Sequence, residues 1–330
     1  MRPNKSLFFV IVGLAVAAVA AMVGAVFLYA DALNVPTVQE TIHIRVVVAP
    51  SARDWADAAA RQFNQANRGV QVKIIEAGDL LPEQEFTADP PPAAWLAGAD
   101  FAVPMAQDRG LRFLPDPRPV ASTSLAWGGY TDKLDAFSQQ YGSLSWDSLH
   151  AKATAPDDLL TLVIASPTNS PEGLAALISA VAAHTGKTSL SSADVSQTLP
   201  WLSETLTENT RTPSQPAERF ATAQGRSIGD LGLLSLAAWR QAGLHQRSDF
   251  RLVPAEPAVY LPLTFAIYDG RGATPEGQKA AAQFRDFLLS PEVQARLSDY
   301  GFDPPQTGTP GVQIDGQAAL SLFRWAQGGL

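Results

Sequence analysis

The stretch IHIRVVVAPSARDWADAAARQFNQANRGVQVKII, residues 42–75, decides the fold of this chain. Ile42–Val48 and Val70–Ile75 are short runs rich in β-branched residues, and such runs predict two strands. The segment between them is long enough for a crossover helix, so the two strands are expected to run parallel. Strand, helix and strand in this order predict an α/β fold with a parallel or mixed sheet.

The crossover helix has recognisable start and face signals. Ser51, with Asp54 three residues further on, has the pattern of an N-cap and capping box. Apolar residues then recur at helical spacing, which predicts the face that packs on the sheet. This face consists of Trp55, Ala59, Phe63 and Ala66.

The alternation of strands and helices restarts at about Thr131 and continues toward the C-terminus. Ser145, Ser170, Ser235 and Ser290 each precede a predicted helix as its N-cap. The predicted helices are Asp132–Tyr141, Ser145–Ala151, Pro171–His184, Leu199–Leu206, Pro216–Ala223, Ser235–Ala242, Pro275–Leu289 and Pro291–Tyr300. The further predicted strands are Ala99–Val103, Pro119–Trp127, Leu160–Ala165, Asp230–Leu234, Phe250–Pro254 and Ala258–Tyr268.

Composition excludes several classes of protein. The 330 residues carry a net charge of −8, and this acidity argues against a nucleic-acid partner, which would require clustered Lys and Arg. The absence of Cys removes disulfides, thiolate metal sites and a lipid-modified N-terminal cysteine. With only four His, a His-rich metal centre is not expected either, and no cofactor is predicted.

The N-terminal sequence predicts that the chain is attached to a membrane. Residues 7–30 contain no charged side chain, and a helix of this length spans about 36 Å, enough to cross a bilayer core of about 30 Å. Arg2 and Lys5 precede the segment and Asp31 follows it, which puts residues 1–6 in the cytoplasm. The length favours a retained anchor or uncleaved signal, with the main domain extracytoplasmic. Cleavage at the A-x-A site near Ala32 would instead give a secreted protein.

Two strings resemble enzyme motifs but stand in the wrong context. Gly225–Gly229 matches G-x-S-x-G, yet a helical pattern precedes it and a strand follows, the reverse of a nucleophile elbow. Gly186-Lys187-Thr188 resembles the end of a P-loop, but Val181 stands where the first glycine is required. No catalytic residue is therefore predicted, and the chain is not expected to be an enzyme.

The segment AAAQFRDFLLSPEVQARLSDYGFDPP, Ala280–Pro305, strongly resembles the end of bacterial extracellular solute-binding proteins of the type 2 periplasmic-binding class. Upstream pieces agree in order: Ile44–Phe63 resembles the family's first strand and helix, and LSWDSL at Leu144–Leu149 its W-x-x-L helix. Ser166–Ala176 is similar to its strand-to-helix turn, and GDLGLLS at Gly229–Ser235 to a strand beside the cleft. The resemblance covers residues 42–305.

Within that class the chain is similar to the solute-binding part of proteins that also carry a von Willebrand A domain. It departs from the usual pattern in one strand, where Ala99-Asp100-Phe101 stands in place of P-D-[VIL]. It also lacks the lipobox cysteine, so a helix would serve as its anchor.

The resemblance implies an α/β fold of two lobes, type 2 periplasmic-binding-protein-like, behind an N-terminal transmembrane helix. Two crossing strands would join the lobes, one at Val120–Trp127 and one at Ala258–Tyr268. The implied organisation is a cytoplasmic N-terminus 1–6, an anchor 7–30, a linker 31–41, lobe I from 42–124 and 259–305, lobe II from 125–258, and a C-terminal extension 306–330.

Candidate ligand-binding residues follow from the same picture, because helix N-termini at the carboxyl ends of strands expose unpaired N–H groups. Hydroxyls there are equally explained as ordinary N-caps, and Trp127, a possible stacking surface for a ring, is equally explained as core. The candidate residues are Ser51, Ser122, Thr123, Thr168, Asn169, Ser170, Ser235 and Tyr260.

The function implied is capture of a small polar or anionic solute between the lobes for an ABC-type importer. The implied partners are this solute, an ABC permease and the membrane, through residues 7–30, with no nucleic acid. The alternative is a sensory or cell-surface interaction module that keeps the fold without transport, with a von Willebrand A-type protein as its partner.

Overall fold

The computed structural model describes Val19 and residues 41–77, 80–155, 160–206, 210–306 and 311–329. The chain divides into two units, Met1–Thr41 and Ile42–Leu330, and all named strands and helices lie in the second. The predicted membrane segment 7–30 lies outside the described residues, apart from Val19. Among the described residues, no helix is both long and apolar enough to cross a membrane.

Eight of the strands in the described part of Ile42–Leu330 form one mixed sheet, ordered β2-β1-β3-β9-β4-β7-β5, with β8 paired to β4. β1 runs parallel to both β2 and β3, as the crossover between them predicts, while β9 and β4 are antiparallel to their neighbours. The strands are β1 Ile42–Val48, β2 Val70–Glu76, β3 Ala94–Ala97, β4 Arg118–Tyr130, β5 Leu162–Ile164, β6 Ser189–Leu190, β7 Leu231–Ser235, β8 Phe250–Pro254, β9 Tyr260–Ile267 and β10 Gln313–Ile314.

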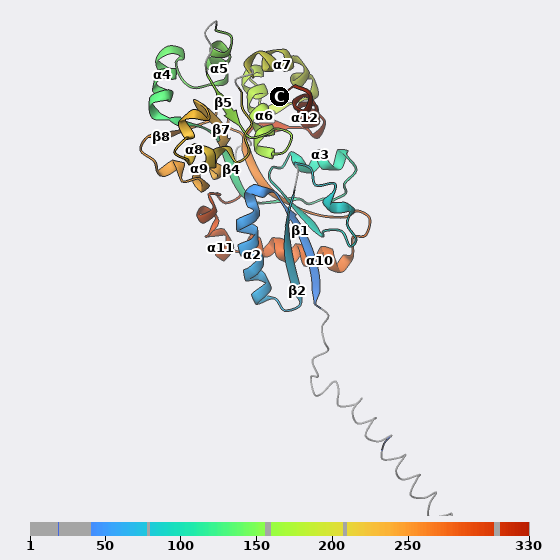
Figure 1. The fold of residues 1–330 in the computed structure, drawn as a ribbon. Coiled ribbons are helices and arrows are strands. Elements are labelled where there is room, and N and C mark those ends of the chain that lie inside the picture. Colours follow the sequence, from blue (N-terminus) through green and yellow to red (C-terminus); the bar gives the residue numbers. More distant parts are fainter. Residues whose placement is uncertain are drawn as a thin grey trace, which may run out of the picture. The chain divides into compact units, whose positions relative to one another are not determined.

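The long strand β4 joins two groups of elements. Its first half, up to Ser124, pairs with β9, and its second half, from Leu125, pairs with β7 and then β8. We keep the names lobe I (42–124 and 259–305) and lobe II (125–258) for the two predicted groups of residues, which all belong to one compact unit, Ile42–Leu330. β9 returns to lobe I and pairs there with β3. The predicted crossing strands are therefore the ones that connect the two groups (Figure 1).

Three of the predicted N-caps are confirmed by side-chain hydrogen bonds at helix starts. Ser145 caps α5 together with Ser148, while Ser170 caps α6 and Ser235 caps α9. The helices are α2 Arg53–Ala66, α3 Ala102–Asp108, α4 Thr131–Tyr141, α5 Trp146–Ala153, α6 Pro171–Thr185, α7 Ser192–Thr205, α8 Pro216–Ala221, α9 Leu236–Gln241, α10 Pro275–Leu288, α11 Pro291–Gln294 and α12 Gly316–Gly329.

Two predictions at the edge of lobe I are wrong. The strand expected at Ala99–Val103 is β3, which ends before Gly98; the Asp100 carboxylate accepts the Phe101 N–H at 2.8 Å and the chain turns into α3. Ser51 does not cap α2, since it lies inside a short 3-10 helix and the N-cap position belongs to Ala52.

Three helix details also differ from expectation. α7 begins at Ser192, well before Leu199, because Ser191 and Asp194 form a capping box ahead of the interior proline. The helix predicted for Pro291–Tyr300 breaks after Gln294, whose side chain donates to the carbonyl groups of Val120 and Leu288 at 2.8 Å each. Ser290 makes no side-chain cap hydrogen bond, and Ala66 is exposed at the end of α2.

The C-terminal extension is part of the core. α12 packs on α3 of lobe I and on α6 and α7 of lobe II (Figure 1). Its buried residues Leu322 and Phe323 belong to a hydrophobic cluster that runs from Trp95 in lobe I to Trp127 in lobe II. Because Trp127 is fully buried and packs edge-on against Trp146, it is core and presents no surface to a ligand.

Replacing Leu322 by Ala is expected to lower the free energy of unfolding by about 2–5 kcal/mol, because the fully buried side chain leaves a cavity between α12 and both lobes. Urea unfolding measures the loss. The matched variant is Arg324→Ala, at an exposed position two residues further along α12. It should change the free energy of unfolding by less than about 0.5 kcal/mol. Equal losses in the two variants would show that α12 is not docked as described.

Candidate functional site

A cavity of about 920 Å³ lies where lobes I and II face each other. Lobe I contributes the turn after β1 at Pro50–Asp54, Gly98 after β3, and the Asp299–Phe302 region. Lobe II contributes the turn from Ala165 to Glu172 and Ser235 at the end of β7. Thr123, on the crossing strand β4, lies between the two groups.

The strand directions explain why these residues converge. β1 and β3 are parallel to each other in lobe I, and β5 and β7 are parallel in lobe II, so the carboxyl ends of each pair lie at one sheet edge. In open α/β sheets such edges collect the loops and helix starts that line a ligand crevice. The cavity therefore occupies the position at which a ligand is expected.

Two of the helix starts that face the cavity, those of α6 and α9, are capped by hydrogen bonds within the protein, whereas those of α2 and α8 have no side-chain cap. The Ser170 hydroxyl accepts the Glu172 N–H at 3.1 Å, and the Ser235 hydroxyl accepts the Ala238 N–H at 3.1 Å. Thr123 Oγ1 accepts the Ala237 N–H at 3.0 Å, which ties β4 to the first turn of α9. These hydroxyls act as caps.

Glu172 links the starts of α6 and α9. Its carboxylate accepts the backbone N–H of Ser235, although Glu172 itself lies in the first turn of α6. Part of its surface reaches solvent, but the carboxyl lies deep among protein atoms, and this burial raises its pKa. The neighbouring carboxylate of Glu218 raises the pKa further, whereas the Ser235 hydrogen bond lowers it.

The two lobes touch at one margin of the cavity. A Cβ atom placed on Gly98 of lobe I would lie 2.9 Å from Cγ of Pro171 at the start of α6, so only glycine permits this approach. Arg240 of α9 forms an ion pair with Asp303 at 3.0 Å, and Gln241 donates to the Tyr300 carbonyl at 2.8 Å. Both contacts join lobe II to the C-terminal part of lobe I.

The structure places five of the eight candidate residues on this cavity: Ser51, Thr123, Asn169, Ser170 and Ser235. The other three lie elsewhere. Ser122 is buried, and its backbone pairs with Asp303; Thr168 bonds the Ser166 hydroxyl at 3.0 Å. Tyr260 lines a smaller cavity beside the C-terminal extension, together with Val312 and Ile314.

Charged and aromatic lining residues were missed from the sequence. Asp54, Glu172 and Glu218 each lie in the first turn of a helix, where a carboxylate is explained by the helix dipole alone. Tyr300 belongs to a short 3-10 helix, Leu297–Tyr300, whereas the sequence predicts one longer helix, Pro291–Tyr300. These carboxylates could have been found from the sequence by their common position. Each lies in the first turn of a helix that follows a predicted strand or loop.

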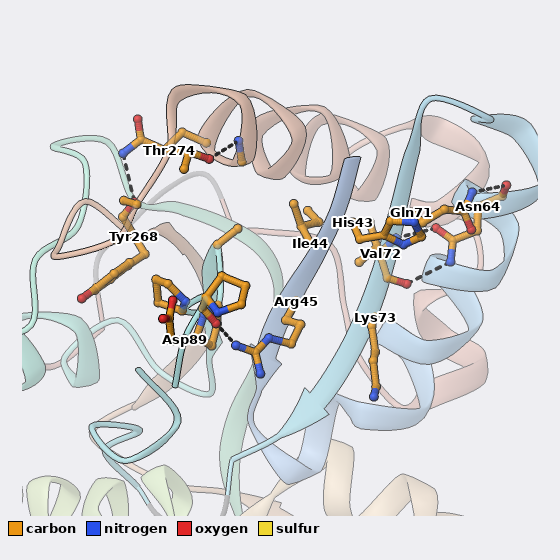
Figure 2. A pocket seen from close by; sticks show the side chains of 18 residues that line it. His43, Ile44, Arg45, Asn64, Gln71, Val72, Lys73, Asp89, Tyr268 and Thr274 are labelled. Atoms are coloured by element: carbon orange, nitrogen blue, oxygen red, sulfur yellow. Dashed lines mark hydrogen bonds between the residues drawn. The ribbon is translucent and has the colours of Figure 1, made fainter. Parts of the chain in front are cut away.

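A second cavity, of about 630 Å³, belongs to lobe I alone (Figure 2). Its polar side chains hold the local backbone: Asn64 bonds Val72, and Gln71 donates to the Asn64 and Asn67 carbonyls. Arg45 donates to the Pro90 carbonyl at the mouth of the same cavity. The first cavity is larger and is lined from both lobes, so it is the better candidate site.

Comparison with known proteins agrees with this geometry. The model of a family described as bacterial extracellular solute-binding protein matches residues 44–303. No curated protein matches the chain.

Solved structures show the same fold at low sequence identity. Iron-bound HitA from Pseudomonas aeruginosa aligns with a TM-score of 0.62 and 17% identity over 86% of this chain and 99% of its own. The sulfate-binding protein SubI from Mycobacterium tuberculosis gives 0.58 and 15%, covering 88% and 99% of the two chains. Maltose-bound MalE3 from T. maritima gives 0.58 and 14%, covering 88% of each chain.

Replacing Glu172 by Gln is expected to raise the free energy of unfolding at neutral pH. The folded-state pKa of Glu172 lies above its ordinary value of 4.5. Between these two pH values the folded protein therefore holds a proton that the unfolded chain releases. The stability contributed by this proton is fully present below pH 4.5 and is lost as the pH rises through the folded-state pKa. The variant keeps an oxygen for the Ser235 N–H and carries no charge.

Urea unfolding from about pH 5 to about pH 8 measures this dependence, and Glu172→Gln should flatten it. Glu276→Gln, an exposed first-turn carboxylate on α10, is the matched control and should leave the profile unchanged. Parallel profiles for wild type and Glu172→Gln would contradict the assignment.

Proposed function

The chain belongs to the family of bacterial extracellular solute-binding proteins, and we propose that it captures a small polar solute in the cavity between lobes I and II. The family and the solved neighbours are non-enzymatic solute-binding proteins, and the chain is not an enzyme. The proposed destination of the solute is an ABC-type importer, with the binding domain on the outer side of the membrane.

One observation carries this proposal. The cavity of about 920 Å³ is lined from both lobes, at the carboxyl ends of β1, β3, β5 and β7. This volume lies in the range that encloses a small organic molecule. A cavity made by two lobes can close by movement about the crossing strands, which is the usual way such a site retains its ligand.

The proposed membrane attachment rests on the sequence of residues 7–30, which carry no charge. Attachment would keep the binding domain near its permease without the lipid-modified cysteine that this chain lacks.

The second candidate function is a sensory or cell-surface interaction module, with a von Willebrand A-type protein as a possible class of partner. It is favoured by α12, which packs on both lobes and extends one hydrophobic cluster across them. A continuous apolar contact of this kind resists separation of the lobes, because opening would expose it to water. A transport receptor predicts ligand-dependent closure, and an interaction module does not.

The test is native mass spectrometry of the full chain purified from its own host, followed by small-angle scattering before and after removal of any bound molecule. A bound small molecule, with a larger radius of gyration after its removal, supports solute capture. If the chain carries no bound molecule and no class of solute raises its thermal stability, the result contradicts solute capture and supports the interaction module.

Replacing Gly98 by Val is expected to weaken binding of the captured solute. The new side chain would meet Pro171, and overpacking of about 1–3 kcal/mol in the closed arrangement corresponds to roughly a tenfold to hundredfold loss of affinity. Isothermal titration calorimetry measures the change. Gly69→Val is the matched control, since a Cβ there meets no atom within 4 Å, and equal affinities in the two variants would exclude Gly98 as a point of closure.

A further inference from the structure

The charge of the captured solute can be inferred from how the cavity lining is already hydrogen-bonded. This step rests on the proposed function, since it takes the cavity between the lobes as the binding site. The sequence predicts a small polar or anionic solute, because hydroxyls and helix N-termini lie near strand ends. The structure gives these groups other partners.

Four backbone donors that an anion could use at the starts of α6 and α9 are occupied. At α9 the Ala237 and Ala238 N–H groups bond Thr123 and Ser235, and at α6 the Glu172 N–H bonds Ser170. The Ser235 N–H, which also faces this region, donates to the Glu172 carboxylate. A carboxylate of the protein thus occupies the place that a bound anion would take between the two helix starts.

Negatively charged side chains, by contrast, outnumber positively charged ones in the lining. Among the described residues that line the cavity, the charged ones are four carboxylates and one guanidinium. The guanidinium of Arg53 is turned to Glu76, at 2.6 Å, and to Asp57, at 3.6 Å. Asp299 has a partner in Arg296, at 3.7 Å. The three remaining carboxylates are Asp54, Glu172 and Glu218.

These three carboxylates make no ion pair with a cation in the described part of the chain. Glu172 and Glu218 both belong to lobe II, and the carboxylate of Glu218 lies close enough to raise the pKa of Glu172, while Asp54 belongs to lobe I. Each lies in the first turn of a helix, so the helix dipole that could attract an anion is already balanced by the protein's own charge. The field inside the cavity therefore favours a positive ligand.

The lining also contains a partly exposed aromatic ring from lobe I. Tyr300 is half-buried at the cavity wall, whereas Phe302 is buried near Trp55. An aromatic face beside carboxylates suits an organic cation. The ring attracts the positive charge of such a cation and also packs against its apolar groups.

A bare metal ion fits less well. No group of three or more His, Asp or Glu side chains in the described ranges is arranged to hold one. Ca²⁺ or Mg²⁺ would require about six or more oxygen ligands at short distance, and the three carboxylates of this lining lie on separate elements.

We propose that the cavity binds a small organic cation whose ammonium or guanidinium group lies between Glu172 and Glu218 of lobe II, facing Asp54 of lobe I. The cavity between the lobes defines the site, and the unpaired carboxylates decide the charge of its occupant. Closure brings Asp54 toward the pair on lobe II, so the cation itself draws the lobes together.

The test is thermal shift and isothermal titration calorimetry on the full chain with putrescine, agmatine and choline as cationic probes. Sulfate, molybdate and malonate are the anionic probes, and glucose is the neutral one. At least one cationic probe should bind, more weakly at high ionic strength because the charges are screened, while the anions should not bind.

Glu218→Gln should weaken the binding cation by about tenfold, the loss of one charge-assisted hydrogen bond, without a change in the unfolding midpoint of the free protein, since Glu218 is exposed. Glu276→Gln, outside the cavity, should leave affinity unchanged and is the matched control. Asp54→Asn tests the contribution of lobe I in the same way.

Binding of an anion or of glucose, with the cations inactive, would overturn the inference and leave solute capture intact. An anion or neutral molecule found by native mass spectrometry would do the same, and a bound amine would support it. Cation binding that Glu218→Gln, Asp54→Asn and Glu172→Gln all leave unchanged would place the cation elsewhere and refute the site. Absence of any bound molecule or stabilising solute would reject the proposed function itself.

Discussion

One strand that changes partners holds the rest of the structure in place. β4 is 13 residues long; one of its edges pairs with β9 up to Ser124 and with β8 from Ala126, while its other edge pairs with β7 from Leu125. In lobe I the strand lies at the end of the sheet, with Asp303 bridged to Ser122, whereas in lobe II it is central between β7 and β8. Both lobes must therefore be oriented about this strand. The strand ends that face each other across it form the cavity, and Thr123 lies there because it is at the point of exchange.

The same arrangement limits how the lobes can move. Rotation about the β4 exchange would have to carry α12 with lobe II or slide it along α3, since it contacts both. The ion pair of Arg240 with Asp303 is partly exposed and contributes little to this restraint, because solvent screens such pairs. The buried side chains of α12 contribute more, because exposing apolar surface costs about 25 cal/mol per Å². Small closing movements on the cavity side are compatible with an intact α12, and wide opening is not.

Much of the fold was accessible from local sequence signals. Capped helix starts such as Ser170, and apolar runs such as Phe250–Pro254, are governed by contacts within a few residues, so pattern alone locates them. Failures occurred where distant contacts decide. β3 is only four residues long and is defined by its pairing with β1 and β9, and α12 is held by elements more than a hundred residues upstream. The fold family followed from motifs at Ala280–Pro305, which carry no information on how the extension packs.

The site was harder to predict because the same residue types serve two purposes. A serine at a helix start can cap its own helix or bind a ligand, and the two are distinguished only by which donors remain free. Ser170, Thr123 and Ser235 are each committed to an amide of the protein, and Glu172 bridges two helix starts across 63 residues of sequence. Once these bonds are drawn, the remaining charged groups of the lining without an ion pair to a described residue are the carboxylates of Asp54 and Glu218. The charge of the ligand that a binding site prefers is thus set by the polar and charged groups that have no partner within the protein. These groups can be identified only once the fold has brought the two lobes together.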